Sequence, residues 1–283
     1  MGGKLLMCFH AAFVTERQHE LKTRNEGEAG HYGNLGNQNS SELTLGILRF
    51  EDLTLLQAAF EVRFEEACLL WDRAGVVWDD TLKVIPNLKR QHTEPSRVVF
   101  ATLHKPQMEL SIEIARLGVI EHQPDKRLEG FSEIVSKFAD IAIPALGVAQ
   151  YLRVGLRLIF AKEFSTPEAA AEAVLATGVI KEPVTPQLGI TTPILQPECA
   201  YRREDGKNGF GFRFKAETLN FEFRPAFGWS DFSEPISRTK HRVNLDVDCY
   251  IQAPVSAETM RFVDWISQTF HIIKRDASSL IGG

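Results

Sequence analysis

The dominant pattern along the chain is an alternation of apolar and polar residues. In the first clear case, Phe60, Val62 and Phe64 alternate with charged neighbours, which is typical of a half-buried strand. The same alternation recurs in five further runs: 108–114, 152–164, 210–214, 219–223 and 243–251. Strands of a doubly wound parallel sheet are apolar on both faces, so one-sided alternation predicts an antiparallel sheet.

Two polar turns are predicted between the later strands. The run from Asp205 to Gly209 is rich in turn-forming residues and is expected to join strands near Tyr201 and Phe212. A second turn, over residues 215–218, is expected to join the runs 210–214 and 219–223.

Helical spacing of apolar residues predicts three main helices. They are a helix over 128–142 that ends before Pro144, a shorter one from Ser165 that stops at Gly178, and a C-terminal helix capped by Ser256. A weaker helix is expected between Val77 and Leu88, up to Pro86.

These elements predict an α+β fold in which helices pack on the apolar face of antiparallel sheet and leave a polar face uncovered. Residues 25–42 are rich in Gly, Asn and Ser, so we expect 1–42 to be a flexible arm and linker. The rest divides into 43–147 and 148–283, two α+β halves with similar patterns of strands followed by a long helix. The patterns leave open whether the halves are a true repeat.

Composition narrows the class of protein. The chain has 283 residues, 44% apolar and 24% charged, which excludes disordered and coiled-coil classes. The net charge of −5 argues against nucleic acid as a partner. No apolar run approaches the roughly 20 residues that span a bilayer, so no membrane partner is expected. Four scattered cysteines without a CxxC pair favour a reducing, cytoplasmic location.

No enzyme motif is present: GxSxG, GxGxxG, the P-loop and HExxH are all missing from the sequence. We therefore assign no catalytic residue, no metal ligand and no cofactor. The basic and aromatic run 206–214 alternates like a strand, which favours a hairpin over a phosphate loop.

Two pairs of charged residues are the candidate ligand-binding positions. Asp246 and Asp248 lie two apart on one predicted strand, so both project from the same face. They would suit a divalent metal, but they equally fit the wet side of a half-buried strand, which we favour. Arg153 and Arg157 flank Gly155 on another strand and would suit a carboxylate or phosphate.

The alternative is structural pairing across the sheet, in which the arginines bind Asp246 and Asp248 or glutamates of a neighbouring strand. If the two strands are neighbours, Arg157 is expected to fork onto one carboxylate, with Asp248 as its expected partner. We prefer this interpretation to a metal site.

The order of several short motifs resembles a sporadically distributed prokaryotic family of uncharacterised proteins of about this length. The motifs are the R-x-G-L-R strand at 153–157 and the L-D-x-D strand at 245–248, which precedes the C-terminal helix. The likeness covers roughly 55–281. The family strand often continues R-Y-I-N, whereas here Leu158, Ile159 and Phe160 follow Arg157, so a polar residue is lost. The resemblance implies no known reaction. By analogy, its patchy distribution implies an accessory or defence-associated role.

Two classes of function follow. The first is a non-catalytic binding or interaction protein, whose partner is an unidentified protein or small molecule and which is free to form oligomers. The second is a metal-assisted hydrolase that uses Asp246 and Asp248, with Arg153 and Arg157 binding an anion. The sequence favours the first.

Overall fold

The computed structural model describes residues 48–85, 87–102, 107–125, 127–180, 193–223, 236–252 and 254–282. The chain divides into two units, Met1–Thr44 and Leu45–Gly283, and all the described residues belong to the second. The arm expected over 1–42 lies outside the described residues.

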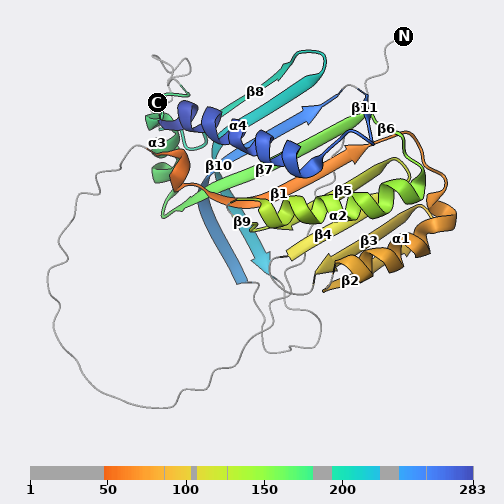
Figure 1. Ribbon diagram of the computed structural model, residues 1–283. Helices are drawn as coiled ribbons and strands as arrows, with labels where there is room; N and C mark the ends of the chain where they lie inside the picture. The colour runs from red at the N-terminus through yellow and green to blue at the C-terminus, as the bar shows by residue number, and fades with distance from the viewer. Residues whose placement is uncertain are drawn as a thin grey trace, which may run out of the picture. The chain divides into compact units, whose positions relative to one another are not determined.

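Along the chain, single helices separate runs of strands (Figure 1). The strands are β1 (Thr54–Arg63), β2 (Leu88–Glu94), β3 (Arg97–Thr102), β4 (Gln107–Glu113), β5 (Arg116–His122), β6 (Gln150–Tyr151), β7 (Arg153–Phe164), β8 (Glu198–Glu204), β9 (Asn208–Phe223), β10 (Ile236–Ile251) and β11 (Val255–Ser256). The helices are η1 (Phe50–Asp52), α1 (Leu70–Val84), α2 (Glu129–Leu146), α3 (Pro167–Ala176) and α4 (Phe262–Gly282).

Within these ranges, nine strands form one sheet in the order β2-β3-β4-β5-β1-β7-β10-β9-β8, and every neighbouring pair is antiparallel. The strands β6 and β11 form a separate short pair. The predicted α+β fold with antiparallel sheet is therefore confirmed.

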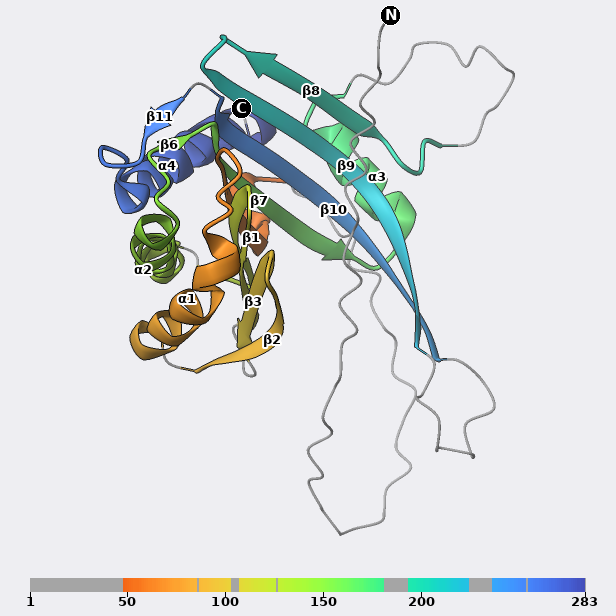
Figure 2. The same ribbon diagram turned by 90° about the vertical axis from the view of Figure 1, so that its right-hand side faces the viewer.

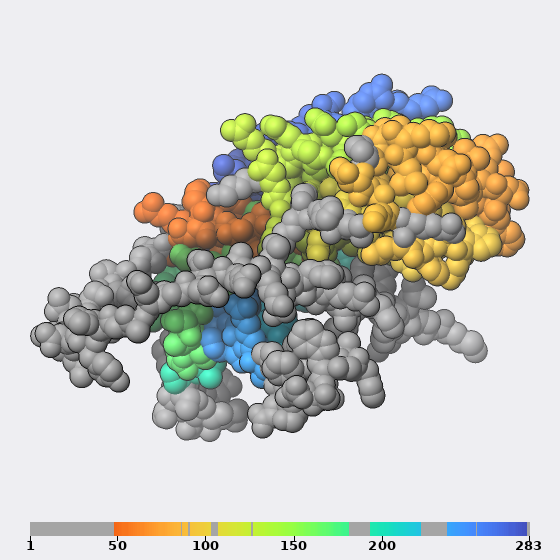
Figure 3. All heavy atoms as spheres, turned by 90° about the horizontal axis from the view of Figure 1, so that it is seen from below, coloured from red at the N-terminus to blue at the C-terminus, as the bar shows by residue number. Residues whose placement is uncertain are grey.

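One face of the sheet meets the helices. Apolar side chains of all four α-helices join the sheet in a single core, and α1, α2 and α4 lie along one side of it (Figures 2 and 3). The core residues on the strands alternate with polar ones, as the sequence predicted. Representative members of this core are Phe60, Val62, Leu110, Phe138, Leu156, Leu158, Val174, Phe212, Phe214, Leu245, Val247 and Ile266.

The opposite face, which none of the described helices covers, is called the open face below. It carries the alternate strand positions, which are mostly charged: Glu61, Arg63, Arg97, Glu113, Arg116, Arg153, Arg157, Arg202, Glu204, Arg213, Lys215, Glu217, Arg242, Asp246 and Asp248.

The two expected halves, 43–147 and 148–283, lie on either side of the β1–β7 pair. In the first, β1 and α1 precede β2 to β5, which run inward from the edge until β5 pairs with β1, and α2 follows. In the second, β7 and α3 precede β8 to β10, which run inward until β10 pairs with β7, and α4 follows. The halves thus resemble each other in the order of their elements, although four strands follow α1 and only three follow α3, and they share one sheet and one core.

The turn predicted at residues 215–218 is wrong. Strand β9 continues through it, because these residues have consecutive partners in β10, from Asn244 opposite Lys215 to His241 opposite Thr218. As a result, Phe212 and Phe214 face the core, whereas Phe221 faces the other side of the same strand. The predicted turn before it is present, since Asp205 Oδ1 accepts hydrogen bonds from the backbone N–H groups of residues 207 and 208.

Two helix boundaries also differ from the prediction. Helix α2 continues through Pro144 to Leu146 and ends at Gly147, whose φ is +67°. A proline in the last turn removes one backbone donor, and the helix nevertheless continues to the buried Leu146. Helix α4 begins at Phe262 and not after Ser256, because Ser256 belongs to β11.

Helix α3 follows the prediction closely. Thr166 caps its N-terminus, where its Oγ1 accepts a hydrogen bond from Ala169 N at 3.1 Å, and Gly178 follows its end with a φ of +71°. The weaker helix expected from Val77 is the longer α1, which begins at Leu70.

Candidate functional site

The four predicted site residues lie together on the open face. Arg153 and Arg157 are on β7, Asp246 and Asp248 are on β10, and these two strands are direct neighbours near the middle of the sheet. In the register, Arg157 lies opposite Asp248. The structure therefore brings together all four candidate ligand-binding residues.

The residues form two ion pairs. Arg157 binds Asp246 with both ends of its guanidinium, at 2.8 Å from Nε to Oδ1 and 2.6 Å from Nη2 to Oδ2. Arg153 Nη2 lies 3.1 Å from Asp248 Oδ2. The forked geometry of Arg157 was predicted, but the partner is Asp246, diagonally across the sheet, and not Asp248.

Gly155 explains the exchange of partners. A Cβ atom at this position would lie 2.8 Å from Nη1 of Arg153, so the guanidinium of Arg153 lies directly over the glycine. From there it reaches Asp248 on β10, and Arg157 then binds the neighbouring carboxylate of Asp246. The glycine thus marks a close approach by a side chain of its own strand.

The pair Arg153–Asp248 is one end of a longer chain of charges across the sheet. Arg153 Nη1 also lies 3.1 Å from Glu61 on β1. Glu61 contacts Arg116 on β5 at 3.6 Å, and Arg116 contacts Glu113 on β4 at 2.7 Å. Arg97 on β3 completes the series, 3.2 Å from Glu113. We call this series, Arg97–Glu113–Arg116–Glu61–Arg153–Asp248, the charge ladder.

A tyrosine continues these contacts toward β8. The ring of Tyr250 on β10 lies between two guanidiniums, 4.6 Å from that of Arg153 and 5.2 Å from that of Arg202. Its hydroxyl accepts a hydrogen bond from Arg202 Nε at 2.6 Å and donates one to Glu204. A Cβ at Gly209 would lie 1.9 Å from this ring, so only glycine leaves room for it.

A second cluster centres on Glu217 of β9. Its carboxylate receives hydrogen bonds from Arg242 Nε at 2.7 Å and from Asn244 Nδ2 at 2.8 Å, and Lys215 Nζ lies 2.5 Å from it. Burial acts to raise the pKa of Glu217, but the hydrogen bonds from Lys215, Asn244 and Arg242 outweigh burial and hold the pKa below its ordinary value. The carboxylate is therefore ionised, and its oxygens are already bound by Arg242, Asn244 and Lys215.

Burial and charge act in opposite directions on Asp248. Burial raises its pKa, the guanidiniums of Arg153 and Arg157 lower it, and the carboxylates of Asp246 and Glu61 raise it, with a net shift upward. The hydrogen bond to Asp246 is the main cause that raises the pKa of Arg157, and it outweighs partial burial, which lowers that pKa. Arg157 therefore carries a fixed positive charge at the centre of the face.

The two aspartates are held by arginines, which sets limits on their chemistry. A divalent ion bound there would have to compete with the fork of Arg157 for Asp246. Within the described ranges, no group of three or more His, Cys, Asp or Glu side chains is arranged to hold a metal ion. Cys249, behind them on the core side, has its pKa raised to about 12, chiefly by burial.

Sequence reasoning missed several residues of this face. Glu61, Glu113 and Arg116 each follow the alternation, but nothing in the sequence shows that their strands are adjacent. Gly209 could have been noticed, because glycine inside an alternating strand often marks a close approach, as it does at Gly155.

No protein-family model matches the chain, and no curated protein matches it. Among the described helices, none has the length and apolar character needed to cross a membrane.

Proposed function

We propose that this protein is a non-catalytic binding protein whose open face docks another protein. The observation that carries the proposal is the charge ladder, in which cations and anions alternate across six strands on a face without described helices. Such a surface complements a partner that also presents both signs of charge, because each exposed charge can exchange its present neighbour for one on the partner.

The alternation of sign favours a protein over a polyanion. A nucleic acid or anionic lipid selects a surface where cations gather without carboxylates between them. Here Arg157, Arg153 and Arg116 each contact a carboxylate. The net charge of −5 agrees with this choice.

Docking is better supported than the hydrolase alternative. Hydrolysis with a metal requires Asp246 and Asp248 as ligands and the arginines as anion binders. The structure instead directs each arginine to an aspartate, at 2.6 Å and 3.1 Å. Membership of the uncharacterised prokaryotic family, a cytoplasmic location and an accessory role belong to the same proposal, supported by the motifs at 153–157 and 245–248 and by the scattered cysteines.

Site-specific photocrosslinking tests the proposal. A benzoylphenylalanine at Arg213, an open-face residue whose side chain is 54% exposed, is compared with one at Lys137 on α2, where the side chain is 49% exposed. In host cells we expect a discrete protein adduct from position 213 and none from position 137. The adduct should weaken when Arg157→Glu is added. Equal labelling from both positions, or no adduct from position 213, would contradict the proposal.

A further inference from the structure

Strands β9 and β10 extend beyond the rest of the sheet as a two-stranded ribbon (Figure 2). Strand β9 pairs with β8 only as far as its residue Lys215, and β10 pairs with β7 only from its residue His241 onward. Among the described strands, residues 219–223 and 236–240 therefore pair only with each other. We call this part the ribbon.

The ribbon has two different sides. On the side continuous with the open face, Phe221 lies opposite Arg238 and Leu219 opposite Lys240. Phe221 is 49% exposed, and Arg238 is exposed beside it. The other side is polar, with Thr239 Oγ1 donating to the side chain of Asn220 at 3.0 Å. A two-stranded ribbon gains little stability by itself in water. Exposed apolar side chains on it therefore indicate contact with another surface.

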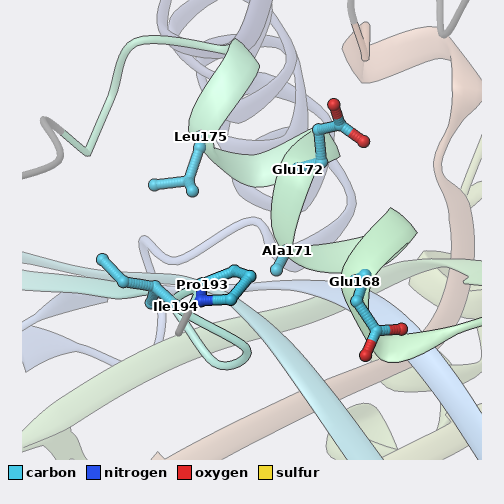
Figure 4. Close-up of a pocket in the computed structure, with 6 residues that line it drawn as sticks. All are labelled: Glu168, Ala171, Glu172, Leu175, Pro193 and Ile194. Atoms are coloured by element: carbon cyan, nitrogen blue, oxygen red, sulfur yellow. The ribbon is translucent and has the colours of Figure 1, made fainter. Parts of the chain in front are cut away.

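A hollow of complementary character lies on the helix-covered side of the sheet. Its volume is about 320 Å³, and it lies between α3 and the segment at Pro193. Ala171 and Leu175 face Pro193 and Ile194 across it (Figure 4). The residues that line it are Glu168, Ala171, Glu172, Leu175, Pro193 and Ile194.

The charges at the hollow have the opposite sign to those of the ribbon. Glu168 and Glu172 are both exposed and lie one turn apart on α3, beside the apolar lining. A phenylalanine flanked by cations therefore has a matching receptor, an apolar hollow flanked by carboxylates.

We propose that the ribbon of one copy of this chain docks into the α3 hollow of a second copy, with Phe221 in the hollow and Arg238 at the glutamates. Lys240 is already paired with Glu163 of its own chain, at 2.5 Å, so Arg238 is the cation assigned to the contact. Ribbon patch and hollow lie on opposite sides of one sheet, so they cannot meet within a single chain. Phe221 faces away from the core that Ala171 joins. If two copies make the contact reciprocally, it closes as an isologous two-fold dimer, and if each copy makes it to the next one, it is heterologous and continues from copy to copy. This association is independent of the open-face docking proposed above.

Analytical ultracentrifugation of the full chain tests the contact, over a concentration series that reaches about 1 mM. We expect concentration-dependent association that weakens at high salt. Phe221→Ala and Glu172→Lys should each weaken association by about tenfold or more. Ser237→Ala, on the polar side of the ribbon, is the matched control and should leave association unchanged. Circular dichroism and thermal melting check that each variant is folded.

Mixing the two weakened variants gives the decisive measurement. The Phe221→Ala chain keeps an intact hollow and the Glu172→Lys chain keeps an intact ribbon, so the mixture should form heterodimers. Combining Arg238→Glu with Glu172→Lys in one chain should recover part of the lost association. A wild-type chain that stays monomeric throughout, or an associating wild type whose variants do not complement on mixing, would overturn the proposal.

Discussion

The guanidinium of Arg157 forks onto Asp246, two residues along β10 from Asp248, which lies directly opposite Arg157 in the sheet register. Arg153 occupies Asp248 from its place over Gly155. This arrangement predicts how substitutions change the free energy of unfolding.

A double-mutant cycle should find coupling between Arg157 and Asp246. The pair is bidentate, but the side chain of Arg157 is 45% exposed, so we expect about 0.2–1 kcal/mol that falls with added salt. The cycle of Arg157 with Asp248 serves as the comparison and should give a smaller value. Chemical denaturation measures both, and the reverse order would contradict the side-chain geometry.

Gly209→Ala should destabilise the fold, because its Cβ would collide with the ring of Tyr250. Overpacking of this kind costs about 1–3 kcal/mol. Gly211→Ala is the matched control on the same strand, since the nearest atom to its Cβ is 3.6 Å away. Denaturation midpoints of the two variants should differ clearly, and equal midpoints would show that Tyr250 moves aside at no cost.

Glu121→Gln should stabilise the protein near pH 7. Burial, aided by the charge of Asp125, raises the pKa of Glu121 above its value in the unfolded chain. Its contribution to stability is therefore fully present below the unfolded pKa and is lost as pH rises through the folded pKa. Glutamine does not ionise, so the variant keeps its stability as pH rises. Glu133→Gln, at an exposed position of α2, is the control. Unfolding free energies from pH 3 to 8 should diverge with rising pH, and parallel curves would contradict this prediction.

Glu217→Gln should have the opposite pH dependence. The pKa of Glu217 is lowered, so its ionised form contributes stability above the unfolded pKa, and the contribution is lost as pH falls through the folded pKa. Loss of charged hydrogen bonds from Arg242 and Lys215 should cost about 1.5–3 kcal/mol near pH 7. The deficit should shrink in acid. A deficit that stays constant with pH would assign the effect to packing alone.

The alternation of apolar residues predicts the antiparallel sheet and the faces of residues 60–63 on β1, 108–113 on β4, 153–164 on β7 and 243–251 on β10, because period two is a local property of a strand. It did not predict which strands are neighbours, so Glu61 could not be placed beside Arg153. The composition of 215–218 is typical of a turn, and only its pairing with β10 shows that β9 continues through it.

The site could be predicted to a similar extent. That Arg153, Arg157, Asp246 and Asp248 share the polar face follows from their spacing. Their pairing depends on where a long side chain lies, and that is decided by the space above Gly155, which the spacing of residues along the strand does not encode. The expected turn at 215–218 divides β9 into two strands, so the sequence does not place Phe221 on the opposite face from Phe212 and Phe214.

The pairing of β1 with β7, called the seam here, also has a consequence for how the chain folds. Arg63 and Arg153 are partners across this seam, so everything from α1 to α2 must be looped out before they meet. The hairpin strands of each half can pair by contacts that are near in the sequence, whereas the seam, like the β1–β5 and β7–β10 pairs, depends on closing a long loop, which is the slower kind of step. The charge ladder crosses the seam at Glu61 and Arg153. A surface recognised through this ladder is presented only by chains that have finished folding.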